Sequence, residues 1–174
     1  MAKKDVAGLL PVDFFTRGYR ISGYIDTRVK TVGDILNDQL TSYLELSNVY
    51  ISRASAPGQI VVTYEIAQLR KDGLLFVIVP VEESRSKVGR SVSYFGKQRY
   101  QAWLALPTFE IDGHFLVTGR SGDFYAYLAK GVDAYIPILN GVARVTALPD
   151  ITFGGEAFLV NRSAIDLFCL GEAL

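Results

Sequence analysis

The sequence has one cysteine and one histidine among its 174 residues. A lone cysteine excludes a disulfide within the chain and any metal site built from several cysteines. Phe168 and Leu170 flank Cys169, which predicts a buried and inert thiol. A lone histidine excludes a multi-histidine zinc site, and any Ser-His-Asp or Cys-His catalytic unit would have to use His114. We therefore expect no metal, no cofactor and no enzymatic activity.

The chain also has no net charge, because its 18 basic residues balance its 18 acidic ones. Proteins that bind nucleic acid non-specifically usually carry a basic excess, so neutrality argues against that role for the whole chain, although a local patch stays possible. No apolar run approaches the roughly 20 residues that span a bilayer. The apolar segment before Pro11 is too short for a secretory signal. We expect a soluble, cytoplasmic protein with no membrane partner.

Apolar and aromatic residues are abundant. Hydrophobic residues make up 49% of the chain, with 10 tyrosines and 10 phenylalanines, while charged residues make up 21%. This composition supplies a sizeable core and is not typical of a disordered chain. The length suits one domain of ordinary size or two small ones.

A seven-residue pattern occurs twice, as Tyr19–Ile25 and Phe109–Phe115. Each copy has an aromatic residue, a charge, Ile, a small polar residue and Gly, then an aromatic or His, then a large apolar residue. A glycine at the same place in two strands predicts strongly bent strands, as small barrels require.

Two later segments extend the match. Residues 43–51 align with 135–143 at an offset of 92, which places Asn48 and Asn140 together at a predicted turn or bulge. Each half then closes with a predicted hairpin, and the same offset matches Ile66 with Phe158 and Phe76 with Phe168. Pro137 indicates that its strand lies at a sheet edge.

One helix is expected in each half. In residues 31–40, apolar side chains recur at helical spacing, Thr31 can cap the helix, and Asp34 suits its first turn. Residues 124–130 occupy the corresponding place in the second half. The predicted fold is mainly β, with two tandem related small β-barrel-like repeats, 1–81 and 99–174, joined by a linker, 82–98.

The closing segments, 68–77 and 159–168, resemble the end of an Sm-like small barrel, where a strand, an Arg-containing turn and a last strand close the sheet. Leu44–Tyr50 resembles the middle strands of that fold. The chain is also similar to uncharacterised bacterial proteins with this two-copy pattern and no assigned function. The resemblance implies an Sm-like or SH3-like small barrel.

The RNA-contacting positions of the Sm family are only half represented. Asn37 and Asp38 match them in the first copy, but Ala126 and Tyr127 stand there in the second. This departure argues against RNA binding, and the resemblance implies no site residues here.

The clearest candidate interaction patch combines basic and aromatic side chains, which neutralise phosphates and stack on bases respectively. It lies in the segment 85–103, and its members are Arg85, Lys87, Arg90, Tyr94, Phe95 and Arg99. The alternative interpretation is a solvated linker that runs into a strand with buried rings.

Three functions are compatible with the sequence. The first is a non-enzymatic binding or assembly module that recognises a protein partner or a second copy of itself, which the tyrosine content and the duplicated pattern favour. The second is a nucleic-acid-binding, Sm-like module that uses 85–103. The third is small-ligand binding between the repeats, near His114.

Overall fold

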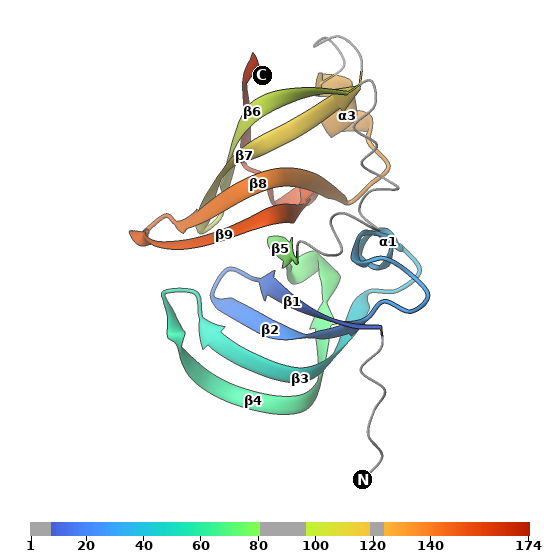
Figure 1. Ribbon diagram of the computed structural model, residues 1–174, viewed down its shortest axis with the longest axis vertical. Helices are drawn as coiled ribbons and strands as arrows, with labels where there is room; N and C mark the ends of the chain where they lie inside the picture. Colours follow the sequence, from blue (N-terminus) through green and yellow to red (C-terminus); the bar gives the residue numbers. More distant parts are fainter. Residues whose placement is uncertain (1–7, 81–96, 119–123) are drawn as a thin grey trace.

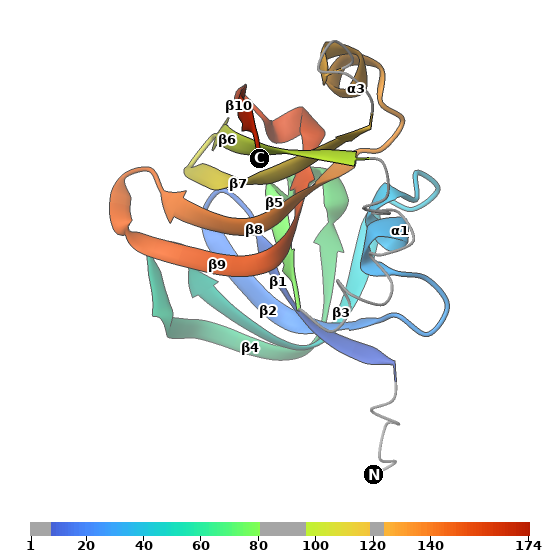
Figure 2. The same cartoon turned by 45° about the horizontal axis from the view of Figure 1, so that its top comes forward.

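The computed structural model describes residues 8–80, 97–118 and 124–174, and its architecture confirms the mainly β class. All ten strands belong to one antiparallel sheet, in the order β10-β6-β7-β8-β9-β5-β1-β2-β3-β4. The strands follow one another along the long axis of the molecule, as Figures 1 and 2 show. The first half comprises β1 (Leu9–Phe15), β2 (Tyr19–Asp26), α1 (Val32–Asn37), β3 (Tyr43–Arg53), β4 (Ala56–Arg70) and β5 (Phe76–Val79). The second half comprises β6 (Lys97–Leu106), β7 (Phe109–Thr118), α3 (Phe124–Lys130), β8 (Tyr135–Val145), β9 (Leu148–Asn161) and β10 (Leu167–Ala173).

Both halves follow the same order of elements, including a short 3-10 helix before the last strand, at Lys71–Gly73 and at Arg162–Ala164. Descent of the halves from one duplicated unit stays a prediction. The predicted linker, 82–98, lies outside the described residues except for its last two, which begin β6. The predicted boundaries of the repeats therefore also stay a prediction.

Local chemistry explains the helices and the bends. The Thr31 hydroxyl oxygen accepts from the Asp34 amide at 3.1 Å, and the Asp34 carboxylate accepts from the Thr31 amide at 3.3 Å, which confirms the predicted cap of α1. The pairing register shifts at Gly23 and at Gly113. A Cβ at Gly113 would lie 2.5 Å from the Ile138 side chain, so the close approach of β8 requires glycine there.

Two asparagines interrupt β3 and β8. Asn48 has φ of 49° and Asn140 has φ of 47°, a left-handed conformation that asparagine tolerates better than most residues. The predicted irregularity at these positions is confirmed.

Pro137 lies in an interior strand, contrary to the predicted edge, because β8 has neighbours on both sides. However, the pairing of β8 with β7 reaches only to Leu139 opposite His114, and Pro137 pairs with Leu159 of β9 alone. The missing amide of Pro137 therefore costs the sheet no hydrogen bond on that side.

The closing strands correspond at an offset of 91, not at the predicted 92. Tyr43 pairs with Arg70, and the equivalent Tyr135 pairs with Asn161. The 3-10 helices keep this offset, from Lys71 to Arg162. The sequence alignment of these strands was therefore wrong by one residue, which in a strand exchanges the two faces.

The same offset of 91 holds for the last strands. The Leu75 amide donates to the Phe15 carbonyl at 2.8 Å, and the Asp166 amide donates to the Ala105 carbonyl at 2.9 Å. Phe76 therefore corresponds to Leu167, and Cys169 corresponds to Ile78.

The two halves meet where β5 pairs with β9. Val77 and Val79 of β5 face the core of the first half, while Phe76 and Ile78 face the core of the second. The ring of Phe76 stacks on that of Phe15, with centroids 4.4 Å apart. One short strand thus contributes to both cores and makes the sheet continuous between the halves.

Polar contacts reinforce this junction. The Tyr135 hydroxyl donates to the Lys71 carbonyl at 2.5 Å, and burial raises the pKa of Tyr135 far above its usual range. The Asn161 amide side chain donates to the Leu74 carbonyl at 2.8 Å. Each contact satisfies a buried polar group with a partner from the other half.

Candidate interaction surface: the open edges of the sheet

Most of the predicted basic and aromatic patch, Arg85, Lys87, Arg90, Tyr94 and Phe95, lies outside the described residues. Its remaining member, Arg99, is exposed on β6. The next residue of the same strand, Tyr100, is buried, and its hydroxyl donates to the Gln98 side chain at 3.1 Å. The ring of Tyr100 therefore cannot stack on a base, and the patch as a whole stays a prediction.

His114 lies on β7, opposite Gln101 of β6 and Leu139 of β8. Burial lowers the pKa of His114, and the nearby Arg99 charge acts in the same direction. Its Nδ1 atom is buried and has no hydrogen-bond partner within the described part of the chain. The described residues contain no group of three His, Cys, Asp or Glu side chains that could hold a metal ion.

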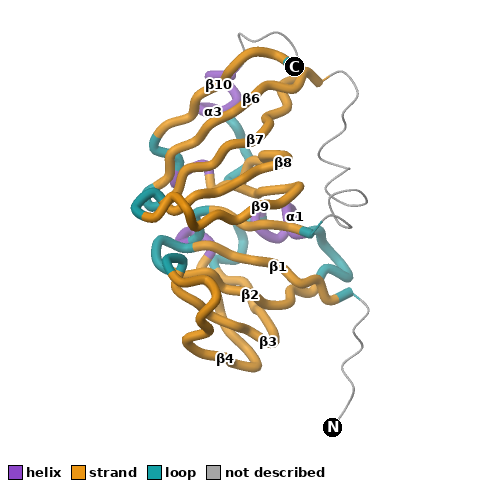
Figure 3. Tube along the Cα trace, turned by 60° about the vertical axis from the view of Figure 1, so that its left-hand side comes forward, coloured by secondary structure: helices purple, strands orange, loops and turns teal. Residues whose placement is uncertain are grey.

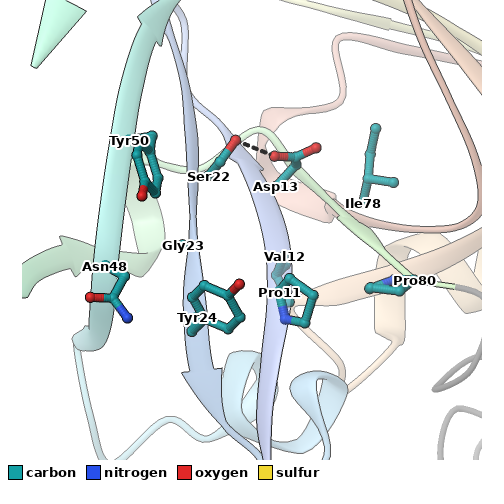
Figure 4. Close-up of a pocket in the computed structure, with 10 residues that line it drawn as sticks. All are labelled: Pro11, Val12, Asp13, Ser22, Gly23, Tyr24, Asn48, Tyr50, Ile78 and Pro80. Carbon is teal, nitrogen blue, oxygen red and sulfur yellow. Dashed lines mark hydrogen bonds between the residues drawn. The ribbon is translucent and has the colours of Figure 1, made fainter. Parts of the chain in front are cut away.

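A groove of about 400 Å³ lies on the outer face of β1, β2 and β3, and all of its lining residues belong to the first half. Figure 4 shows Tyr24 and Tyr50 along this groove, with Asp13 beside Ser22. The Asp13 carboxylate accepts from the Ser22 hydroxyl and, at 2.8 Å, from the Arg20 guanidinium. Its charge is therefore already engaged within the protein, which leaves a mainly apolar, open groove.

The strand order ends at β4 on one side and at β10 on the other. Figure 3 shows these two strands at opposite ends of the molecule. A strand at an edge presents unpaired backbone amides and carbonyls, and natural proteins commonly protect such edges with Lys, Pro or a covering segment. Among the described residues, no further strand pairs with the outer side of β4 or β10, so we ask whether the composition of these two strands protects them.

The edge at β4 is long and apolar. Between Ile60 and Leu69 the strand has no Lys and no Pro, and Glu65 is its only charged residue. Its large exposed apolar side chains are Ile60, Val61, Tyr64 and Ile66. Such an exposed, unprotected strand is typical of a surface that pairs with another chain.

The backbone of β4 shows which amides are open. The Lys71 amide donates to the Ser42 carbonyl beside β3 at 2.9 Å. Because amides alternate along an antiparallel strand, those of Arg70, Gln68 and Ile66 point away from β3. At the corresponding place in the second half, the Asn161 amide donates to the Leu75 carbonyl at 2.9 Å, so this side of the strand can accept a partner.

The edge at β10 carries the lone cysteine. Leu167 is 53% exposed and Cys169 is also exposed, so the prediction of a buried cysteine is wrong. Phe168 and Leu170 pack partly against the core of the second half. In an edge strand alternate side chains face inward and outward, and Cys169 has the outward phase.

Sequence reasoning missed both edges. The alternation in 60–69 predicts a strand, but the position of that strand within the sheet depends on pairings between distant segments. One signal was present: both faces of β4 carry apolar residues, as is common for strands that are covered on both sides.

Comparison with family models, with curated proteins and with solved structures found no match. Within the described residues, no helix is both long enough and apolar enough to cross a membrane.

Proposed function

We propose that this protein is a non-enzymatic assembly module whose copies associate by continuing the β-sheet through its open edges. The observation that carries the proposal is that both terminal strands of the sheet present exposed apolar residues, and that neither residues 60–69 of β4 nor β10 contain a protecting Lys or Pro. Backbone hydrogen bonds across such a contact supply affinity, and burial of the exposed side chains adds to it.

The net charge of zero supports the same role, because copies without net charge repel one another little as they approach. The partner in this proposal is a second copy of the chain. The sheet within one copy already joins two halves by antiparallel pairing of β5 with β9. Association between copies would use the same type of contact.

The test places a charge on each edge in turn. Ile66 of β4 is 56% exposed and Leu167 of β10 is 53% exposed, so Ile66→Lys and Leu167→Lys remove little core packing from a single copy. A matched control is Leu40→Lys, which makes the same kind of change at a loop residue that is 95% exposed. Analytical ultracentrifugation measures the mass, and far-UV circular dichroism checks that each variant is folded.

We expect wild type and Leu40→Lys to sediment as the same homo-oligomer. At least one edge variant should dissociate, with affinity lowered about tenfold or more, which corresponds to about 1.4 kcal/mol. Lysine weakens edge pairing because its charge must be desolvated or held away from the contact. A wild type that is monomeric, or edge variants that keep the wild-type mass, would overturn the proposal.

A further inference from the structure

We infer that copies associate head to tail, with β4 of one copy paired to β10 of the next, in the register that β9 and β5 use inside the chain. This inference rests on the proposed function and deepens it by naming the partner strand and the register. Edge pairing between copies could also join β4 to β4 or β10 to β10. The internal junction selects the mixed pair, because it joins the fourth strand of one half to the fifth strand of the other.

The internal junction supplies the register. It pairs Phe76 with Val160 and Val79 with Ala157 at its two ends, in an unbroken antiparallel ladder. Subtracting 91 from a residue number in β9 gives the equivalent residue of β4, and adding 91 to a residue number in β5 gives the equivalent residue of β10. The resulting pairs between copies are Leu167 with Leu69, Phe168 with Gln68, Cys169 with Ala67, and Leu170 with Ile66.

This register completes the core of the first half. Ala67 and Leu69 pack against that core at its open edge and are only partly buried. In the internal junction the corresponding residues, Phe158 and Val160, are fully buried, and Phe76 of β5 lies among them in the second core.

Within the described part of one copy, the outward side chains of β10, Leu167 and Cys169, are exposed and do not belong to a buried core. Leu167 and Cys169 correspond to Phe76 and Ile78, which pack into the core of the other half. In the proposed contact, Leu167 and Cys169 would cover Ala67 and Leu69 in the same way. Cys169, which is exposed in a single copy, would then be covered by the β4 strand of the neighbouring copy.

The contact at Cys169 has a geometry that can be trapped chemically. In the internal junction, Leu75 and Asn161 form a hydrogen-bonded pair, so Ile78 and Phe158, three positions further along the ladder, form a non-hydrogen-bonded pair. Such pairs have Cα atoms about 4.5 Å apart, within the range that a disulfide spans. Cys169 and Ala67 correspond to this pair.

The experiment introduces Ala67→Cys and leaves Cys169 in place. Mild oxidation should then form disulfides that join position 67 of one copy to position 169 of the next, giving a ladder of multimers on non-reducing gels. Mass spectrometry should find the peptide that ends at Arg70 linked to the peptide that begins at Ser163. A link within one copy is excluded because β4 and β10 lie at opposite ends of the sheet.

Two controls set the register and the direction. Gln68→Cys shifts the new thiol by one residue and to the opposite face of β4, so its yield of cross-linked product should be at least about fivefold lower. Ala67→Cys combined with Cys169→Ser should give no ladder. Circular dichroism of the reduced variants, compared with wild type, shows that each one is folded.

The outcomes separate this inference from the proposed function. A wild type that assembles, with no link between positions 67 and 169, would overturn the head-to-tail register and leave the assembly role standing. Cross-linking that persists in the Cys169→Ser combination would show that β4 meets β4. A monomeric wild type would overturn both.

Discussion

At the scale of single residues, His114 is the one side chain with an ordinary pKa near neutral pH. Burial lowers this pKa, and the Arg99 charge lowers it further, while a contact with the Leu139 backbone acts in the opposite direction. The folded protein therefore binds a proton at His114 less readily than the unfolded chain does. As a result, stability falls as the pH drops through about 6.5 toward the pKa in the folded state.

We predict that His114→Gln flattens this dependence. Urea denaturation between about pH 7.5 and 5.5 should show a smaller loss of unfolding free energy in the variant than in its parent. Both chains should carry Ile66→Lys, so that association does not contribute to the measured stability. Identical pH slopes in the two chains would contradict the account of this histidine.

The roles of single residues could be predicted where a local backbone conformation favours one residue type. Asn48 and Asn140 were identified as irregular positions, and both adopt a left-handed conformation. Thr31 was identified as a helix cap, and its hydroxyl accepts the expected hydrogen bond. The burial of Cys169 was predicted wrongly, because apolar neighbours in the sequence indicate a strand but do not show which face of that strand is covered.

At the scale of elements, the proposed contact between β4 and β10 brings opposite charges together at one end. Extending its register by one pair places Arg70 directly opposite Asp166 of the next copy. Arg70 now contacts Asp72 of its own copy at 2.7 Å, with both side chains largely exposed, so this surface ion pair constrains it little.

We predict that Arg70→Glu weakens association, because it sets two carboxylates against each other across the strands. Opposite-charge pairs across strands contribute about 0.2–1 kcal/mol, and like charges cost a similar amount. Adding Asp166→Arg to Arg70→Glu should restore the affinity measured by ultracentrifugation. Arg53→Glu, the same charge change at the end of β3, should have no comparable effect, and a failed rescue would contradict the register.

The elements themselves could largely be predicted from periodicity. The range 124–130 expected for the second helix agrees with α3, and the alternation through 60–69 agrees with β4. What the sequence could not supply is the order of strands in the sheet, since that order depends on contacts between segments far apart in the chain. The alignment error of one residue in the closing strands also arises from distant contacts. Only the pairing register of the strands distinguishes an offset of 91 between the halves from an offset of 92.

At the scale of the whole molecule, the two halves form one continuous sheet and share buried contacts. Phe15 and Phe76 of the first half pack against Phe109 and Phe158 of the second, with ring centroids between 5.0 and 5.9 Å apart for the pairs in contact. This internal junction uses the same pairing that we propose between copies. A contact from β4 to β10 uses different surfaces on the two partners, so repeated addition produces either a closed ring or an open filament.

Native mass spectrometry of freshly purified wild-type protein shows whether copies of the chain associate. We predict a homo-oligomer whose mass is a whole multiple of the 19.2 kDa chain, with no additional bound mass. A species of 19.2 kDa alone at every protein concentration would contradict it. So would a monomer that carries a discrete small ligand or co-purifying nucleic acid.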